Sequence, residues 1–175
     1  MILFRYHTPV EFDDLVLCTD GEALNGLWFE GSRKPQFGCA ETQSFASQPL
    51  VVHDTCRWLD LYFTGHQPDF MPYCRIDGLT PFRREVLEIM REIPFGKTMS
   101  YGEIASQICQ KHGLAKMSAQ AVGGAVGWNP IGIILPCHRV VGANGKLTGY
   151  GGGMHNKIAL LRLERHAVNC ISMSK

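Results

Sequence analysis

The chain has 175 residues, of which 45% are apolar and 19% are charged, and its formal net charge at pH 7 is +1. This length allows one large domain or two small ones with modest cores. The near-zero charge excludes a basic tail or a surface that coats a polyanion, so any contact with nucleic acid must come from a local patch. The seven cysteines are odd in number and form no C-x-x-C pair, which favours a reducing compartment over a disulfide scaffold.

The first 78 residues predict a small α/β domain. Short apolar runs, "LVLC", "GLWFE" and "PLVVHD", are separated by Gly, Pro and Asp, a pattern typical of a small sheet with one or two helices. The opening stretch "MILFRYHTPVEFDD" lacks the basic region and long apolar run of a signal peptide, and no run reaches the length of a membrane span. Residues 67–81, "QPDFMPYCRIDGLTP", have the punctuation of a connector. We therefore predict domains at 1–78 and 79–175, with the boundary near Gly78.

Beyond Gly78 the pattern becomes helical. Thr80 as N-cap and Pro81 at the first helical position predict a helix near 80–93. Ser100 followed by Glu103 has the spacing of a capping box and predicts a second helix near 100–110. Further helices are expected near 118–127 and 154–165. The second and third helices have the order of a helix-turn-helix, although any helical hairpin would share this pattern.

Between the last two predicted helices lies "NPIGIILPCHRVVGANGKLTGYGGG". We interpret it as an Asn-Pro turn, a buried strand that ends at Cys137, a Gly-rich hairpin and a glycine loop. The preceding helix, "SAQAVGGAVGW", is rich in Gly and Ala, which lowers helix propensity but removes side-chain bulk. Such a face suits either tight packing within the protein or the close approach of another molecule.

Cys137 and His138 form the most reactive pair in the sequence. On a strand, neighbouring side chains point to opposite faces, so a turn or a bridging water is needed to connect the two. Glu164 falls on the apolar side of the last predicted helix, where a carboxylate is expected to be paired. Cys137, His138 and Glu164 could therefore form a relay of nucleophile, base and orienting carboxylate, which leaves the reaction class open between group transfer and hydrolysis.

The motif "PCHRV" after "NPI", with "SYGEIA" upstream and "GYGGG" and "LLRLE" downstream, resembles the 6-O-alkylguanine-DNA alkyltransferase (methylated-DNA--protein-cysteine methyltransferase) family. These motifs cover residues 80–165, and "LDLYFTGHQPDF" resembles the stretch that precedes them in family members. The resemblance implies an α/β fold, with a small N-terminal α/β (RNase H-like) sheet domain and a mainly helical winged-helix-like domain that contains a helix-turn-helix. It also implies a single-turnover repair protein that needs no cofactor.

In that family the reactive cysteine accepts the alkyl group of 6-O-alkylguanine irreversibly, after the base has flipped out through the minor groove. Carried over, the resemblance makes Cys137 the acceptor, His138 the base that acts through a water, and Glu164 its orienting partner. Tyr101 would donate a hydrogen bond or proton to the leaving guanine, and Asn129 would pin the turn before the active site. The implied substrate-binding residues are Val140, Tyr150, Gly151 and Trp128. Whether O4-alkylthymine is also a substrate stays open.

The helix of small residues then becomes the DNA-contacting helix. The implied contacts are made by Gln120, Ala121, Gly124, Ala125, Ser118 and Lys116. Gln120 departs from the family, which usually has an arginine there that fills the space left by the flipped base. Because Gln lacks the charge and the planar fork of Arg, we expect slower repair of duplex DNA than in a Gln120→Arg variant.

Two competing functions would also use parts of this pattern. A non-catalytic protein that recognises alkylated bases and recruits other repair factors would not need Cys137. A cysteine hydrolase would leave the predicted helix-turn-helix unexplained.

Because His7, Cys18, Cys39 and His53 lack the close pairs of a structural zinc site, no metal is expected. We expect a monomer that acts on double-stranded DNA containing alkylated guanine, without membrane contact, in the cytoplasm or nucleoid, or in a nucleus if the source is eukaryotic.

Overall fold

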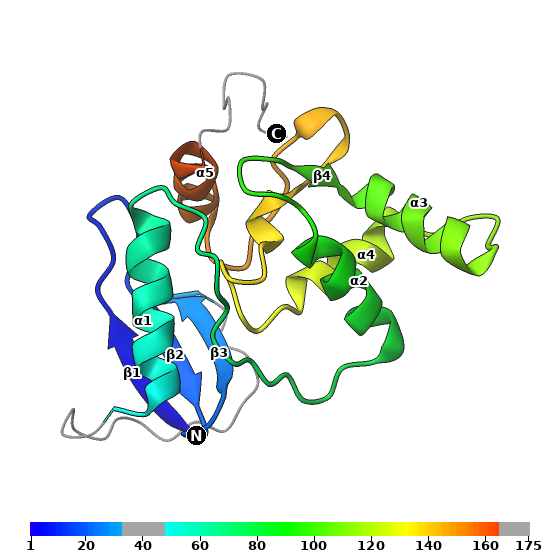
Figure 1. The fold of residues 1–175 in the computed structure, drawn as a ribbon. Coiled ribbons are helices and arrows are strands. Elements are labelled where there is room, and N and C mark those ends of the chain that lie inside the picture. Colours follow the sequence, from blue (N-terminus) through cyan, green and yellow to red (C-terminus); the bar gives the residue numbers. More distant parts are fainter. Residues whose placement is uncertain (33–47, 165–175) are drawn as a thin grey trace. The chain divides into compact units, whose positions relative to one another are not determined.

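The computed structural model describes residues 1–32 and 48–164, and its contacts divide the chain into two compact units (Figure 1). Unit 1 comprises Met1–Asp77 together with a short return segment, Pro130–Ile134. Unit 2 comprises Gly78–Asn129 and the chain from Leu135 onward. The first division falls at the Pro- and Gly-containing connector, whereas the return segment lies in the middle of the region expected to form the second domain.

In its described residues, unit 1 is a three-stranded antiparallel sheet covered by one helix. The strands are β1 (Ile2–Tyr6), β2 (Leu15–Thr19) and β3 (Leu24–Phe29), in the order β1-β2-β3. Helix α1 (Leu50–Phe63) packs against β2 and β3. Its buried residues repeat at helical spacing and form one face: Val51, Val52, Thr55, Trp58, Leu59 and Tyr62. The described part of unit 1 thus has the predicted composition of a small sheet and a helix.

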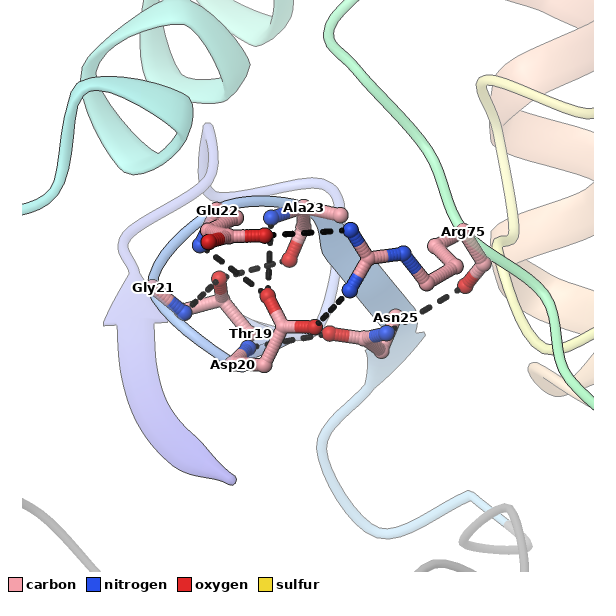
Figure 2. A network of polar contacts seen from close by, with 7 residues as sticks. All are labelled: Thr19, Asp20, Gly21, Glu22, Ala23, Asn25 and Arg75. Carbon is pink, nitrogen blue, oxygen red and sulfur yellow. Dashed lines mark hydrogen bonds and ion pairs between the residues drawn. The ribbon is translucent and has the colours of Figure 1, made fainter.

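A polar network ties the connector to the turn between β2 and β3 (Figure 2). The carboxylate of Asp20 accepts the backbone N–H of Glu22 at 3.0 Å and the guanidinium of Arg75 at 2.7 Å. Arg75 also donates to Glu22 at 3.2 Å. Next to this network, an isolated parallel bridge joins Leu24 to Cys74. The connector therefore begins as an extra pairing partner of β3 rather than as a free loop.

The prediction of a buried strand before Cys137 is wrong. Only Ile131 pairs, through an isolated bridge to Leu27, although the segment is buried as expected. Ile133 has a left-handed φ of 66°, and the N–H of the next residue bonds back to Gly132 O at 2.7 Å, which makes a γ-turn. A second three-residue turn is centred on Pro136, where Cys137 N donates to Leu135 O at 2.8 Å. The two turns break the extended backbone that a strand requires.

The described part of unit 2 holds four α-helices and a minimal parallel pair of strands. The helices are α2 (Pro81–Arg91), α3 (Tyr101–His112), α4 (Ala119–Gly127) and α5 (Met154–Leu163). The strands β4 (Met99–Ser100) and β5 (Val140–Val141) pair in parallel. All four helices confirm the predicted ones to within two residues at each end. Apolar side chains of α2, α3 and α4 are buried where the three pack together: Val86, Leu87, Met90, Ile104, Ala105, Ile108, Val122, Ala125 and Val126.

Local capping explains where these helices begin. Thr80 Oγ1 accepts the N–H of Arg83 at 3.2 Å, and Ser100 and Glu103 form the reciprocal bonds of a capping box at 3.1 and 2.6 Å. Helix α3 ends at Gly113 in the left-handed conformation, with a φ of 64°. None of the helices in the described ranges combines the length and the apolar character needed to span a membrane.

Candidate active site

Cys137 lies on a single 3₁₀ turn, Cys137–Arg139. Within that turn His138 is completely buried and Arg139 is 5% exposed, whereas Cys137 is partly exposed. The turn replaces the predicted strand end, so neighbouring side chains here do not alternate between two faces. Cys137 thus keeps part of its surface exposed, while the next two side chains point into unit 2.

The buried side chains converge on Glu164, the residue that caps the end of α5. Glu164 is 2% exposed and accepts His138 Nε2 at 2.8 Å. Arg139 Nε donates to both carboxylate oxygens at 3.1 and 2.9 Å, and the backbone N–H of Gly96 donates at 3.0 Å. The pairing expected for Glu164 is thus present, and a buried guanidinium adds to it.

The charges in this network are set by burial and pairing. Burial alone would raise the pKa of Glu164, but the hydrogen bonds and charges of His138 and Arg139 outweigh it and hold this pKa well below its ordinary value. Burial lowers the pKa of His138, and its bond to Glu164 offsets this only in part. At neutral pH the site therefore contains a carboxylate, a guanidinium and a neutral imidazole.

The Cys137 sulfur is bordered by polar groups. Burial raises the pKa of the thiol, while hydrogen bonds from Asn129 and Tyr150 and the charge of Lys157 act in the opposite direction. Asn129 Nδ2 also donates to Leu135 O at 2.9 Å. It thereby holds the turn that leads into Cys137. The resting sulfur is a thiol, so its proton must move before it can attack as a thiolate.

Tyr101, the first residue of α3, belongs to the same neighbourhood. Burial raises the pKa of its phenol, and the nearby Cys137 adds to that rise. Its ring packs beside Gly123 of α4, where an added Cβ would lie 3.7 Å from Tyr101 Cε1. Tyr101 is thus wedged between α4 and the cysteine turn.

Helix α4 has a small, exposed face. Gln120, Ala121 and Gly124 are exposed, and a Cβ built on Gly124 would meet nothing within 4 Å. Ser118 is the N-cap, and its side chain accepts the N–H of Gln120 at 3.1 Å, while Lys116 is exposed in the preceding turn. Ala125 is different, because it is only 3% exposed and lies on the opposite face that packs inside unit 2. The DNA contact expected of Ala125 does not fit this burial.

Trp128, Gly151 and Val140 are distributed around the site. Trp128 caps the end of α4, and the Arg83 guanidinium lies over its ring, 4.5 Å from the centroid. Gly151 is exposed in the turn before α5, and Val140 is buried. Trp128 is accordingly a half-exposed ring stacked on a cation rather than a core residue.

Three participants were not anticipated from the sequence: Arg139, Gly96 and Lys157. A buried Arg two residues after Cys137, in an apolar run, is a usable signal, because such a charge requires a carboxylate partner. Gly96 has a left-handed φ of 73°, and a Cβ there would lie 2.7 Å from Glu164 O, so the close approach requires glycine.

Of the residues considered as metal ligands, Cys39 lies outside the described ranges. Within residues 1–32 and 48–164 no group of three or more His, Cys, Asp or Glu side chains could hold a metal ion.

Comparison with known proteins places this site in a family. The family model "6-O-methylguanine DNA methyltransferase, DNA binding domain" matches residues 81–166. A Mycobacterium leprae methylated-DNA--protein-cysteine methyltransferase is 48% identical over 110 residues, which are 63% of this chain and 63% of that protein. A Methanosarcina acetivorans protein of the same name is 40% identical over 151 residues, which are 86% of this chain and 90% of the relative.

A solved structure extends the match to nearly the whole chain. Mycobacterium tuberculosis OGT in complex with DNA superposes with a TM-score of 0.78 at 36% identity, covering 97% of this chain and 98% of that one. The two proteins therefore share the mixed α/β architecture with its small antiparallel sheet, and the match includes both units of this chain. The chain belongs to the methylated-DNA--protein-cysteine methyltransferase family.

Proposed function

We propose that this protein repairs DNA by transferring an alkyl group from 6-O-alkylguanine in double-stranded DNA to Cys137, once per molecule. The observation that carries the proposal is a partly exposed cysteine placed directly beside a buried His138–Glu164–Arg139 network in a chain of this family. S-alkylcysteine has no easy leaving group to restore the thiol, so one protein molecule is consumed per lesion.

The chemistry begins with the thiol proton. Because an ionised Glu164 is only an acceptor, His138 Nε2 carries the hydrogen of their 2.8 Å bond, which leaves the basic lone pair on Nδ1. The Cys137 proton passes through a water to this nitrogen, and Glu164 stabilises the imidazolium that results. Arg139 keeps the carboxylate ionised, so the proton stops at His138 instead of moving on to Glu164.

The thiolate then attacks the alkyl carbon. One S–C bond forms, the bond from this carbon to guanine O6 breaks, and the bond electrons leave with the guanine. Tyr101 donates its phenolic proton, or a hydrogen bond, to the ring as this anion forms. Asn129 holds the turn that carries Cys137 in place for the attack.

The DNA surface of the proposal is the exposed face of α4. Gln120, Ala121 and Gly124 supply a face without bulk that suits the narrow minor groove, and Ser118 and Lys116 are suited to phosphates. The reactive sulfur lies inside unit 2, so the damaged base must leave the stack to meet it. Tyr150, Gly151, Val140 and Trp128 would line the pocket that receives it.

Finer assignments complete the proposal. Unit 2 is taken as the DNA-binding and alkyl-acceptor domain with a winged-helix-like architecture, and unit 1 as an RNase H-like domain. We propose a cytoplasmic or nucleoid-associated monomer that needs no cofactor. A recognition-only protein would have no use for Cys137 and its network, so this second function is not favoured.

The test is the intact mass of the protein after incubation with a duplex oligonucleotide that carries one 6-O-methylguanine. One methyl group per molecule, mapped to Cys137 and absent in Cys137→Ala, is expected. Cys109→Ala is the matched control, because Cys109 is a half-buried cysteine of α3 outside the network. Tight binding of the duplex without a change in mass would overturn the proposal in favour of damage recognition.

A further inference from the structure

Lys157 is the buried charge for which the mechanism above has no use. It lies on the buried face of α5, and its relative exposure is 0%. Complete burial is rare for lysine, because its ammonium group loses the hydration that a point charge needs. Such a position calls for a compensating role or a compensating partner.

Two backbone carbonyls hold the ammonium group. Lys157 Nζ donates to Val140 O at 2.7 Å and to Thr148 O at 3.3 Å. An ammonium group has three donors, so these bonds leave one unused. In the described part of the chain no carboxylate pairs with Lys157, and Glu164 on the same helix is already engaged by His138 and Arg139.

The contacts of the cation place it in the neighbourhood of the acceptor sulfur. Its Nζ is 5.9 Å from the centroid of the Tyr150 ring, and the Tyr150 hydroxyl is hydrogen-bonded to Cys137. The carbonyl that binds Lys157 most closely belongs to Val140, three residues after Cys137. Three groups thus lie around the Cys137 sulfur: the ammonium group of Lys157 on α5, the phenol of Tyr150 in the glycine loop, and the carbonyl of Val140 after the cysteine turn.

We propose that Lys157 is a positioning residue of the acceptor site, whose ammonium charge, fixed by Val140 O and Thr148 O, stabilises the thiolate form of Cys137. The inference deepens the proposed function and rests on it. No proton is exchanged with Lys157: it stays an ammonium ion while the thiol proton moves to His138. Its charge supplies the countercharge that the thiolate would otherwise lack inside the protein.

The electrostatics agree with this role. Burial lowers the pKa of Lys157 to about 8, so the group is still mainly charged at pH 7, and the Cys137 thiolate raises that pKa again. Lys157 in turn lowers the pKa of Cys137. It also disfavours protonation of His138, but for His138 it is the weakest of the influences, behind burial, Glu164 and Arg139. The charge therefore acts chiefly on the sulfur.

The test is the rate of Cys137 alkylation by iodoacetamide at pH 7, where Lys157 is charged, followed by peptide mass in Lys157→Gln, Lys157→Met and Lys157→Arg. Gln can still donate two hydrogen bonds to the carbonyls but has no charge, Met has neither, and Arg keeps the charge. The other ionisable groups around the sulfur stay constant in all variants: Tyr101, His138, Arg139, Tyr150 and Glu164. Lys146→Gln, an exposed lysine in the same loop, is the matched control.

The expected result is a fall of about tenfold in this rate for the Gln and Met variants, because an adjacent charge moves a thiol pKa by about one unit and the thiolate fraction at pH 7 follows it. The single-turnover rate of methyl transfer at pH 7 should fall to the same extent. Lys157→Arg and Lys146→Gln should keep the wild-type alkylation rate.

A folded Lys157→Gln protein with the wild-type rate of alkylation at pH 7 overturns the inference, even if its methyl-transfer rate falls. If the Met variant does not fold, the Gln variant decides the matter alone. The iodoacetamide reaction needs no DNA, so a failure of the proposed function, seen as no methyl transfer by the wild type, is distinguishable from a failure of this inference.

Discussion

Replacing Glu164 by Gln should destabilise the protein strongly, because it removes the countercharge of the buried Arg139 guanidinium. Arg139 is 5% exposed and donates to both carboxylate oxygens, and apart from Glu164 its guanidinium binds Ile93 O at 2.8 Å. A neutral amide keeps the shape of the side chain but removes the countercharge. Breaking a buried ion pair in this way costs roughly 3–5 kcal/mol, against a typical total stability of about 5–15 kcal/mol.

The chain offers a matched control at Glu85. Its carboxylate also accepts from a histidine and a cation, His112 at 2.9 Å and Lys111 at 2.8 Å. These partners are 49% and 62% exposed, however, so the same substitution there should cost about 0–1 kcal/mol. Urea unfolding followed by circular dichroism measures both variants. A Glu164→Gln cost no larger than that of Glu85→Gln would refute the view that burial makes this network essential.

The pH dependence gives a second reading of the same network. The folded pKa of Glu164 lies below its ordinary value of 4.5, so its contribution to stability is complete above that value and is lost as the pH falls below it. The difference in unfolding free energy between wild type and Glu164→Gln should therefore be constant from pH 5 to pH 7 and shrink toward pH 3. A difference that stays constant down to pH 3 would contradict the assigned charge state.

Substitutions at three single positions give further predictions. Gln120→Arg should transfer methyl groups from duplex DNA faster than the wild type in single-turnover assays, and equal rates would refute the role assigned to Gln120. Gly124→Ala should raise the free energy of unfolding by up to about 1 kcal/mol, because helix propensity improves and nothing lies within 4 Å of the added Cβ. The same variant should bind duplex DNA more weakly, and unchanged affinity in a titration would contradict close approach of α4. Because the folded pKa of Lys157 is about 8 against 10.5 for the free group, stability should rise by about 2 kcal/mol between pH 7 and pH 10 relative to Lys157→Met, as unfolding at both pH values would show.

Helix ends were predictable because their signals are local. Thr80, Ser100 and Glu103 bind backbone groups three residues away, so the sequence neighbourhood contains the whole interaction. The segment before Cys137 was not predictable in the same way. Its apolar run favours a strand, but Pro136 and the left-handed Ile133 turn it twice, and the one bridge it makes is to Leu27, about a hundred residues earlier.

The residues of the site differ in the same way: some contacts have a local signal in the sequence and others depend on tertiary packing. His138 next to Cys137 is visible in the sequence, and helical spacing puts Glu164 on a buried face, so their contact could be predicted. The approach of Gly96 to Glu164 depends on tertiary packing alone. Lys157 has no local signal either, because a lysine in an amphipathic helix is ordinarily solvated.

The arrangement of charges explains why proton transfer within this site is feasible. Before transfer, the buried groups are the Glu164 carboxylate, two cations in Arg139 and Lys157, a neutral imidazole and a thiol. Moving the proton creates an imidazolium and a thiolate without changing the total charge. The imidazolium forms against Glu164, and we infer that the thiolate forms against Lys157. Each new charge thus appears opposite one already fixed in place, so little reorganisation is required inside the protein.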